Sequence, residues 1–386
     1  MSRAVGFGTK YFGVTGNPIK DSLSPEIWNA AFKEFHIDAV YLRLCAENGK
    51  DALSFAKEIG LSALSVTSPF KQTISDELEP VNAVMLGAGG EAKFFNTDVD
   101  GFLSSYLDIK NRPAKPALII GAGGSARSAI IALKKAGEVN ISLANRTKNK
   151  AQQLCTEFGL NLVDWDTVTQ NIVDKYNVFT CISHNNVVNT DFDSDYYRTD
   201  FARRWLCYQA EILFKKFYDF EPYAIMKKTL DEALLKKRDK KSIALIGFMG
   251  TGKTFAGRAL AEKKNLVFYD TDEIIEGRAG KSVAEIFAQD GEACFREMEK
   301  DVVRGLNFSK PCVVSCGGGL NLDEGNLKRI KDHCNVTWLW SDFEIICSRL
   351  RMDNSRPLFL YKTNAKKLFD ERKPLYAKAS DVCVRL

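Results

Sequence analysis

The stretch Ile243-Ala-Leu-Ile-Gly-Phe-Met-Gly-Thr-Gly-Lys-Thr-Phe-Ala-Gly257 decides the fold of the last third of this chain. Four apolar residues come first, and Gly247–Thr254 then fit the pattern GxxxxGK[ST], whose backbone N–H groups curl around a phosphate chain. The residues that follow continue as a helix, and its macrodipole favours an anion. The stretch therefore predicts a strand, a phosphate-binding loop and a helix, with Lys253 on the outer phosphates and Thr254 on Mg²⁺.

Carboxylates and arginines beyond the loop narrow the acceptor of the phosphoryl group. Asp270 and Asp272 end the next predicted strand, where metal ligands and acceptor hydroxyls belong beside such a loop. Arg356 lies in a predicted lid. Arg296 and Arg372 are two further arginines, which nucleotide binding does not require. Because arginine pairs with a carboxylate through two hydrogen bonds, these two residues predict an acceptor that bears a carboxylate.

The ordered motifs GFMGTGKT, DTD, FREME, SCGGG, SRPL and ERKPLY resemble shikimate kinase over residues 242–386. The resemblance implies ATP-dependent phosphorylation of shikimate, in which positioning and electrostatics supply most of the catalysis. It implies that Asp270 serves the Mg²⁺ shell or activates the acceptor hydroxyl, and that Arg356 closes over the transferring phosphoryl group. The implied shikimate-binding residues are Asp272, Arg296, Gly317, Gly318, Gly319 and Arg372, and the implied ATP-binding residues are Gly247, Gly250, Thr251, Gly252, Lys253 and Thr254. The implied metal ligands are Thr254 and Asp270.

A second glycine-rich turn, Gly121-Ala-Gly-Gly-Ser-Ala-Arg127, lacks the Lys-Ser/Thr end and predicts a different kind of phosphate cradle. Such turns between a strand and a helix are common, so the turn alone is a weak indication of dinucleotide binding. The next predicted strand ends in Asn145, Arg146 and Thr147. An acidic residue there would bind the ribose hydroxyl of NAD, whereas an arginine accommodates a 2′-phosphate. The sequence therefore favours NADP.

Polar residues near predicted strand ends in the first hundred positions indicate a substrate site. Ser22 and Ser24 precede a predicted helix, where they either cap it or face an anion. Lys71 and Asp98 follow two different predicted strands. The pair could share a substrate hydroxyl as general acid and base, or form a structural salt bridge.

The motifs NPIxxSxSP, VTxPFK, VNxV, NTDxDG, GAGGxAR, NRT and YQAxxxF resemble shikimate dehydrogenase across about residues 9–225. The resemblance implies Lys71 and Asp98 as the catalytic pair for NADPH-dependent reduction of 3-dehydroshikimate. The implied substrate-binding residues are Ser22, Ser24, Thr67, Asn82 and Gln209, and the implied NADPH-binding residues are Gly121, Gly123, Gly124, Asn145, Arg146 and Thr147.

This half departs from the family pattern at three places. Asp21 replaces the usual histidine, and Ser65 replaces the usual asparagine. Between Ser183 and Gln209 the chain is about thirty residues shorter than a six-strand Rossmann sheet requires. The missing elements normally flank the nicotinamide, so this segment affects the nicotinamide pocket most.

Composition fits a protein with two or three globular domains: 386 residues, of which 45% are hydrophobic and 27% charged. A net charge of +5 is too small to predict a nucleic-acid partner, and small anionic substrates account for it as well. Ten cysteines without zinc-site spacing predict a reducing compartment. We expect a cytoplasmic protein with small-molecule substrates, no signal peptide and no membrane span.

Alternating strand-like and helix-like segments predict α/β architecture throughout the chain. The expected parts are a substrate-binding domain at 1–100 completed by a helix at about 201–225, a shortened Rossmann-like NADP domain at 101–200, a linker at 226–241 and a P-loop kinase domain at 242–386. The linker assignment rests on the charge-dense run at 227–241.

The two halves together predict a bifunctional enzyme of aromatic amino-acid biosynthesis. One half would reduce 3-dehydroshikimate to shikimate, and the other would phosphorylate shikimate at its 3-hydroxyl. The alternative is an active kinase joined to a degenerate, non-catalytic dehydrogenase-like module that binds shikimate or stabilises the chain. A gluconate-type kinase is a further alternative, but it would leave Arg296 and Arg372 beside the aspartate pair unexplained.

Overall fold

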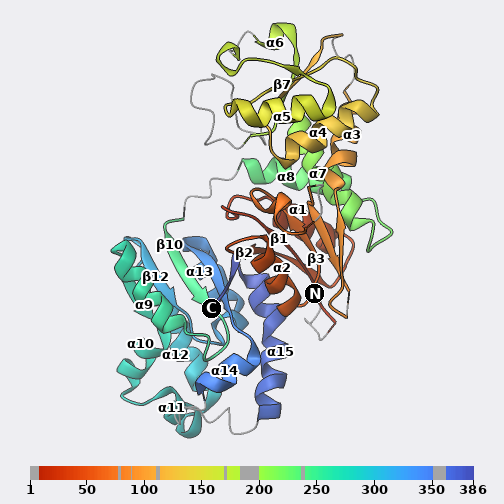
Figure 1. Ribbon diagram of the computed structural model, residues 1–386. Helices are drawn as coiled ribbons and strands as arrows, with labels where there is room; N and C mark the ends of the chain where they lie inside the picture. The colour runs from red at the N-terminus through yellow and green to blue at the C-terminus, as the bar shows by residue number, and fades with distance from the viewer. Residues whose placement is uncertain are drawn as a thin grey trace.

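The computed structural model describes residues 8–76, 80–87, 89–109, 114–168, 172–182, 200–235, 240–350 and 362–386. Arg356 and the first part of the shortened segment, 183–199, lie outside the described residues. Figure 1 shows three parts: an N-terminal unit (8–109 with 200–235) in the middle, a glycine-loop unit (114–182) at the top and a P-loop unit (240–386) at the lower left. Each part is α/β, so the predicted fold class is confirmed.

The N-terminal unit alternates strands and helices before it ends in a hairpin and a long helix. Its strands are β1 (Lys10–Thr15), β2 (Ala39–Cys45), β3 (Leu61–Val66), β4 (Ala83–Leu86) and β5 (Ala92–Phe95), and its first helices are α1 (Ser24–Glu34), α2 (Gly49–Glu58) and α3 (Thr97–Leu107). Strands β1, β2 and β3 are parallel, while β4 and β5 are antiparallel additions at the edge. The sequence analysis did not predict β4.

Two helices return to this unit after the glycine-loop unit. They are α7 (Asp200–Phe214) and α8 (Tyr223–Leu234). The predicted linker at 226–241 is therefore wrong in its first part, since Met226 and Leu230 of α8 are buried in one core with Phe12 and Trp28. The charged residues of α8 occupy its solvent side, and this made an amphipathic helix resemble a solvated run.

The glycine-loop unit contains a four-stranded parallel sheet in the order β8-β7-β6-β9. Its elements are β6 (Ala117–Ile120), α4 (Gly124–Lys135), β7 (Ile141–Ala144), α5 (Lys148–Phe158), β8 (Asn161–Leu162), α6 (Ile172–Lys175) and β9 (Asn177–Thr180). Strand β6 is entirely buried, as a central parallel strand with helices on both faces should be.

The P-loop unit follows the same parallel principle with more helices. Its strands are β10 (Ser242–Ile246), β11 (Val267–Asp270), β12 (Cys312–Ser315), β13 (Cys334–Trp340) and β14 (Val382–Arg385). Its helices are α9 (Lys253–Lys264), α10 (Thr271–Ala279), α11 (Val283–Gln289), α12 (Gly291–Gly305), α13 (Glu324–His333), α14 (Phe343–Leu350) and α15 (Lys362–Ala379). None of the described helices is long and apolar enough to cross a membrane.

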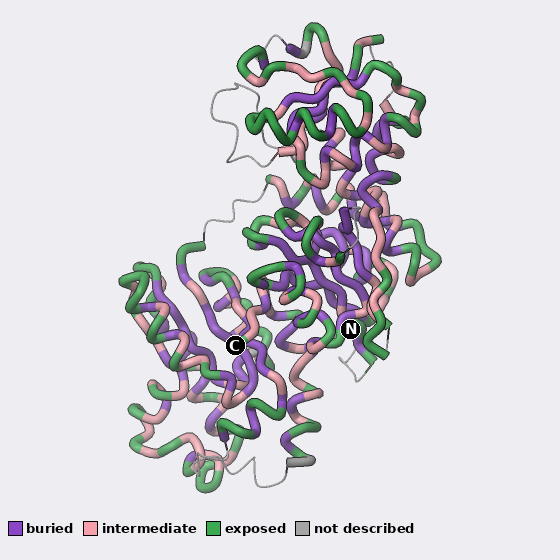
Figure 2. Tube along the Cα trace, viewed as in Figure 1, coloured by how far each residue is buried: buried purple, intermediate pink, exposed green. Residues whose placement is uncertain are grey.

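The N-terminal and P-loop units share one sheet of ten strands, in the order β11-β12-β10-β13-β14-β2-β1-β3-β4-β5. The join is a parallel pairing of β14 with β2, with Cys383 opposite Leu44 and Val384 opposite Cys45. One hydrophobic core, which includes Phe55 from α2 and Trp340 from β13, runs across the join. Figure 2 shows that the strands of both units are largely buried. The two units therefore fold against each other, and nothing in the sequence analysis predicted this.

Phe55→Ala should destabilise both units because Phe55 is fully buried in their shared core. We expect the free energy of unfolding to fall by about 3–5 kcal/mol. Urea denaturation, followed by circular dichroism and by tryptophan fluorescence, checks this value. Val139→Ala removes part of a side chain that is 87% exposed and should change stability by less than about 0.5 kcal/mol. An unchanged transition midpoint for Phe55→Ala would contradict the shared core.

Candidate active sites

The phosphate-binding loop lies between β10 and α9, as predicted. Gly250 and Gly252 have φ values of +77° and +84°, which side chains other than glycine rarely adopt. The Nζ atom of Lys253 donates to the carbonyl oxygens of Gly247 and Phe248 at 2.9 and 3.0 Å. The lysine thus lies across the mouth of the loop, where a phosphate chain would offer it stronger acceptors.

Thr254 and Asp270 meet beside the loop. The Thr254 hydroxyl donates to Oδ2 of Asp270 at 2.7 Å, while Oδ1 of Asp270 accepts the N-terminal amides of α10. A hydroxyl and a carboxylate are hard oxygen donors, which suit Mg²⁺. The described residues contain no cluster of three or more His, Cys, Asp or Glu side chains that could hold a metal. This pair fits an Mg²⁺ ion that takes its other ligands from water and phosphate, as Mg²⁺ commonly does.

The predicted acceptor residues converge on the turn Gly317-Gly318-Gly319 after β12. A Cβ at Gly317 would lie 2.5 Å from Oδ1 of Asp272, and a Cβ at Gly319 would lie 2.6 Å from both terminal nitrogens of Arg296. Arg372, from α15, donates to the carbonyl oxygen of Gly318 at 3.1 Å. Side chains from α10, α12 and α15 therefore surround a backbone that only glycine allows so close.

Glu299 and Tyr376 complete this pocket, although the sequence analysis gave neither a role. Glu299 is 1% exposed and accepts from Arg296 at 3.0 Å. Burial raises the pKa of Glu299 above its ordinary value, and Arg296 opposes that rise. The Tyr376 hydroxyl donates to the carbonyl oxygen of Gly318, and burial raises its pKa to about 12. The spacing of Glu299 one turn after Arg296 was the available signal for its role.

Lys71 and Asp98 of the N-terminal unit form an ion pair beside the glycine-loop unit. Their charged atoms are in contact, and their side chains are 11% and 9% exposed. Nζ of Lys71 also donates to the hydroxyl of Ser125 at 3.0 Å, a residue of the glycine loop that the sequence analysis did not select. Cys181 lies near the pair, and burial raises its pKa to about 12, so its thiol stays neutral. The pair is thus held beside the loop predicted to bind the dinucleotide.

Of the predicted substrate-binding residues of this half, Asn82 and Gln209 lie close together, while Ser22, Ser24 and Thr67 make other contacts. Asn82 accepts from the amide of Thr97 at 2.7 Å, and its side-chain nitrogen lies 3.4 Å from Oε1 of Gln209. Ser22 accepts from the amide of Ser24 at 3.4 Å, but Leu23 is the N-cap of α1 and no side chain caps this helix. The amide of Thr67 donates to Thr15 at the end of β1.

The predicted dinucleotide residues lie at the carboxyl ends of β6 and β7. Gly121 has φ +121°, and a Cβ there would lie 3.1 Å from the carbonyl oxygen of Cys181. Gly123 precedes α4 and has open space where a Cβ would be, while a Cβ at Gly124 would lie 3.4 Å from Lys71. Asn145 donates to the carbonyl oxygen of Thr147, and Arg146 is exposed beside them. The cradle and the exposed arginine fit a dinucleotide with a 2′-phosphate.

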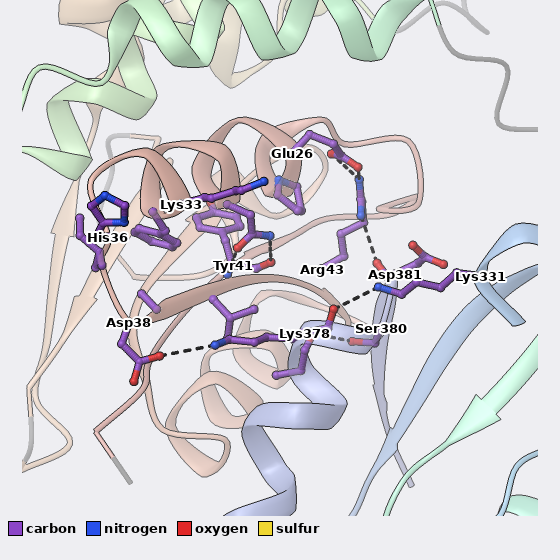
Figure 3. A pocket seen from close by; sticks show the side chains of 17 residues that line it. Glu26, Lys33, His36, Asp38, Tyr41, Arg43, Lys331, Lys378, Ser380 and Asp381 are labelled. Atoms are coloured by element: carbon purple, nitrogen blue, oxygen red, sulfur yellow. Dashed lines mark hydrogen bonds and ion pairs between the residues drawn. The ribbon is translucent and has the colours of Figure 1, made fainter. Parts of the chain in front are cut away.

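A cavity of about 550 Å³ lies at the join of the shared sheet, away from both groups of predicted residues. It lies between α1, the first residues of β2 and residues 377–381, whose side chains Figure 3 shows. Asp38 pairs there with Lys378 at 3.5 Å, and Arg43 donates to the carbonyl oxygen of Asp381 at 3.1 Å. None of the predicted site residues lines the cavity.

Comparison with known proteins assigns all three units. Residues 249–385 match the model of the shikimate kinase family, residues 14–88 that of the shikimate dehydrogenase substrate binding domain, and residues 107–196 that of shikimate / quinate 5-dehydrogenase. A shikimate kinase of Ruegeria pomeroyi is 41% identical over 147 residues, which are 37% of this chain and 75% of the relative. A shikimate kinase of Persephonella marina is 41% identical over 140 residues, or 36% of this chain and 85% of the relative.

A solved structure of a shikimate dehydrogenase in complex with NADP⁺ aligns with 60% of this chain and 98% of its own, with a TM-score of 0.50 and 24% identity. At that identity the likeness establishes the fold alone. The chain therefore belongs to the shikimate kinase family through its P-loop unit, and this unit is fused to segments that match the models of the shikimate dehydrogenase substrate binding domain and of shikimate / quinate 5-dehydrogenase.

Proposed function

We propose that the chain is a bifunctional enzyme that reduces 3-dehydroshikimate with NADPH and then phosphorylates shikimate at its 3-hydroxyl with ATP. The observation that supports the kinase step is the convergence of Asp272, Arg296 and Arg372 on one glycine turn beside the phosphate-binding loop. The observation that supports the reductase step is the Lys71–Asp98 pair, which also contacts the glycine loop through Ser125.

In the reductase step, NADPH supplies the hydride when bound. Lys71 and Asp98 are placed to hold the substrate oxygen that becomes a hydroxyl, and Lys71 can donate the proton to it. Asn82 and Gln209, which face each other across 3.4 Å, would hold other polar groups of the ring. Arg146 and Thr147 would receive the 2′-phosphate, with Asn145 fixing the end of the strand.

In the kinase step, ATP supplies the phosphoryl group, and Lys253 and Thr254 would hold its phosphates and Mg²⁺. Arg296 and Arg372 would hold the shikimate carboxylate, and Asp272 its hydroxyls. Asp270 lies 2.7 Å from the Thr254 hydroxyl, so it is better placed for the Mg²⁺ shell than for the acceptor. Arg356, the proposed lid residue, lies outside the described residues.

A cytoplasmic location belongs to the same proposal. Its support is that all ten cysteines are free thiols, seven of them buried. NADP, ATP, Mg²⁺ and the two small-molecule substrates are the ligands that the sites described above would take.

Lys71→Ala should abolish the reductase and so distinguish the bifunctional enzyme from a kinase with a non-catalytic module. Loss of the proton donor is expected to lower kcat about 10²- to 10⁴-fold. Oxidation of shikimate, followed as NADPH absorbance, measures it, and Lys93→Ala, at an exposed position of β5, is the matched control. If the wild type shows no NADP-dependent turnover while its kinase is active, the non-catalytic module is correct.

Lys253→Ala and Asp272→Ala should each abolish shikimate-dependent ADP release. The first removes the charge that faces the phosphates, and the second removes a carboxylate from the acceptor pocket. A coupled ADP assay measures both, with Lys263→Ala at the other end of α9 as the control. ADP release that persists in both variants would refute the kinase site.

Glu299→Gln should change two separate properties: the pH dependence of folding stability and the affinity of the acceptor pocket for shikimate. Because the folded pKa of Glu299 is raised, the folded chain binds this proton more tightly than the unfolded chain, and wild type loses stability as pH rises from 4.5 through the folded pKa. The melting temperature of the variant minus that of wild type should therefore increase as pH rises across that window.

The same variant should raise the KM for shikimate at neutral pH by about tenfold, because Arg296 loses its charged partner. Glu297→Gln makes the same change two residues away, on a side chain that is 67% exposed and paired with Lys300. This control should leave both measurements at wild-type values. A wild-type KM for Glu299→Gln would contradict the role of Glu299 in holding Arg296.

A further inference from the structure

Helix α15 contacts a different unit on each of two faces. Arg372 and Tyr376 reach the carbonyl oxygen of Gly318 in the acceptor pocket. Lys373, the next residue after Arg372, reaches the N-terminal unit: its Nζ lies 4.7 Å from the centroid of the Tyr11 ring on β1. One helix therefore carries an arginine of the kinase pocket and a lysine held by the dehydrogenase half.

Trp340 of β13, on which α15 packs, also contacts the N-terminal unit. Nζ of Lys373 lies 5.2 Å from the centroid of the Trp340 ring, and Phe369 of α15 packs on the same ring at 5.4 Å. The indole nitrogen of Trp340 donates to Oε1 of Glu58 at 2.7 Å. The other oxygen of Glu58 accepts from Arg385 of β14 at 2.9 Å. A carboxylate of α2 thus fixes the aromatic ring on which α15 lies.

We propose that the dehydrogenase half is a structural part of the kinase acceptor site, and that Tyr11 and Glu58 are positioning residues that hold α15, and with it Arg372, against Gly318. This inference rests on the kinase function proposed above. Displacing a substrate-holding side chain by about 1 Å can cost a large part of the catalytic rate, so a helix held on one face only would hold Arg372 less well.

The effect should be larger at the acceptor than at the nucleotide, although Phe248 of the phosphate-binding loop also packs on Phe369 of α15 at 5.3 Å. The phosphate-binding loop comes from β10 and α9, whereas Tyr11 and Glu58 reach the kinase through α15, β13 and β14. The reductase pair, Lys71 and Asp98, lies beyond β3 and β5, away from the Tyr11 end of β1. Loss of the Tyr11 ring should therefore change the affinity for shikimate in the kinase reaction more than the affinity for ATP.

The test compares Tyr11→Leu with Tyr11→Phe in the full chain. Removing the ring should raise the KM for shikimate in the kinase reaction on the order of three- to tenfold, which is the range that a lost cation–π contact allows, and leave the KM for ATP within about twofold. Tyr11→Phe keeps the ring and should restore the wild-type KM. Phe220→Leu is the control, because Phe220 is 42% exposed and stacks on Phe35 within the N-terminal unit.

A lower melting temperature for Tyr11→Leu with an unchanged KM for shikimate would overturn the proposal and leave the contact a purely structural one. If Tyr11→Leu does not fold, Glu58→Ala tests the second support, with Glu58→Gln as the variant that keeps an acceptor for Trp340. Hydrogen exchange of the α15 amides should be faster in the ring-deleted variant, and unchanged exchange would also overturn the proposal. Absence of shikimate-dependent ADP release in wild type would overturn the proposed function itself, a result that no variant is needed to recognise.

Discussion

The parallel pairing of β14 with β2 is the constraint on which the rest of the structure depends. Without it, each strand would present unpaired N–H and C=O groups at the edge of its own sheet. Arg43 secures the join: its side chain is 6% exposed, pairs with Glu26 at 2.7 Å and donates to the carbonyl oxygen of Asp381 at 3.1 Å. This buried guanidinium takes partners from both units, so separating the units would leave a buried charge without part of its compensation.

The join also determines how the two proposed active sites are related. Strand β1 begins at Lys10, beside the contact with α15, and ends at Thr15, whose carbonyl oxygen accepts from Thr67 in the proposed reductase site. The six residues of β1 span roughly 20 Å. Every pairing from β11 to β3 is parallel, so the residues of both proposed sites follow the carboxyl ends of strands in one sheet, which supports them both. If both proposed activities are present, the fusion links the two steps through this shared sheet.

Much of this could be predicted from sequence because the two phosphate cradles have strict local patterns. The loop before α9 and the turn before α4 each need glycines at fixed positions, and Arg296 and Arg372 are the type that a carboxylate-bearing acceptor requires. The role of Asp272 came from the resemblance to shikimate kinase alone. The shared sheet could not be predicted, because β2 and β14 are short apolar strands whose sequences do not specify a partner. Tyr376 was missed for a similar reason, since a tyrosine in a helix gives no sign that its hydroxyl will reach a backbone carbonyl on another element. The helix α8 was misjudged because its buried residues are outnumbered by charged ones.

The distance along the chain between the paired strands matters for how the protein is made. Arg43 and Asp381, which meet at the join, are 338 positions apart. At typical translation speeds, on the order of 20 to 70 s pass between synthesis of the first residue and the second. During that interval the outer edge of β2 has no strand to pair with, and exposed strand edges are templates for association between chains. On a ribosome carrying a partly made chain, this edge is where a chaperone would be needed first.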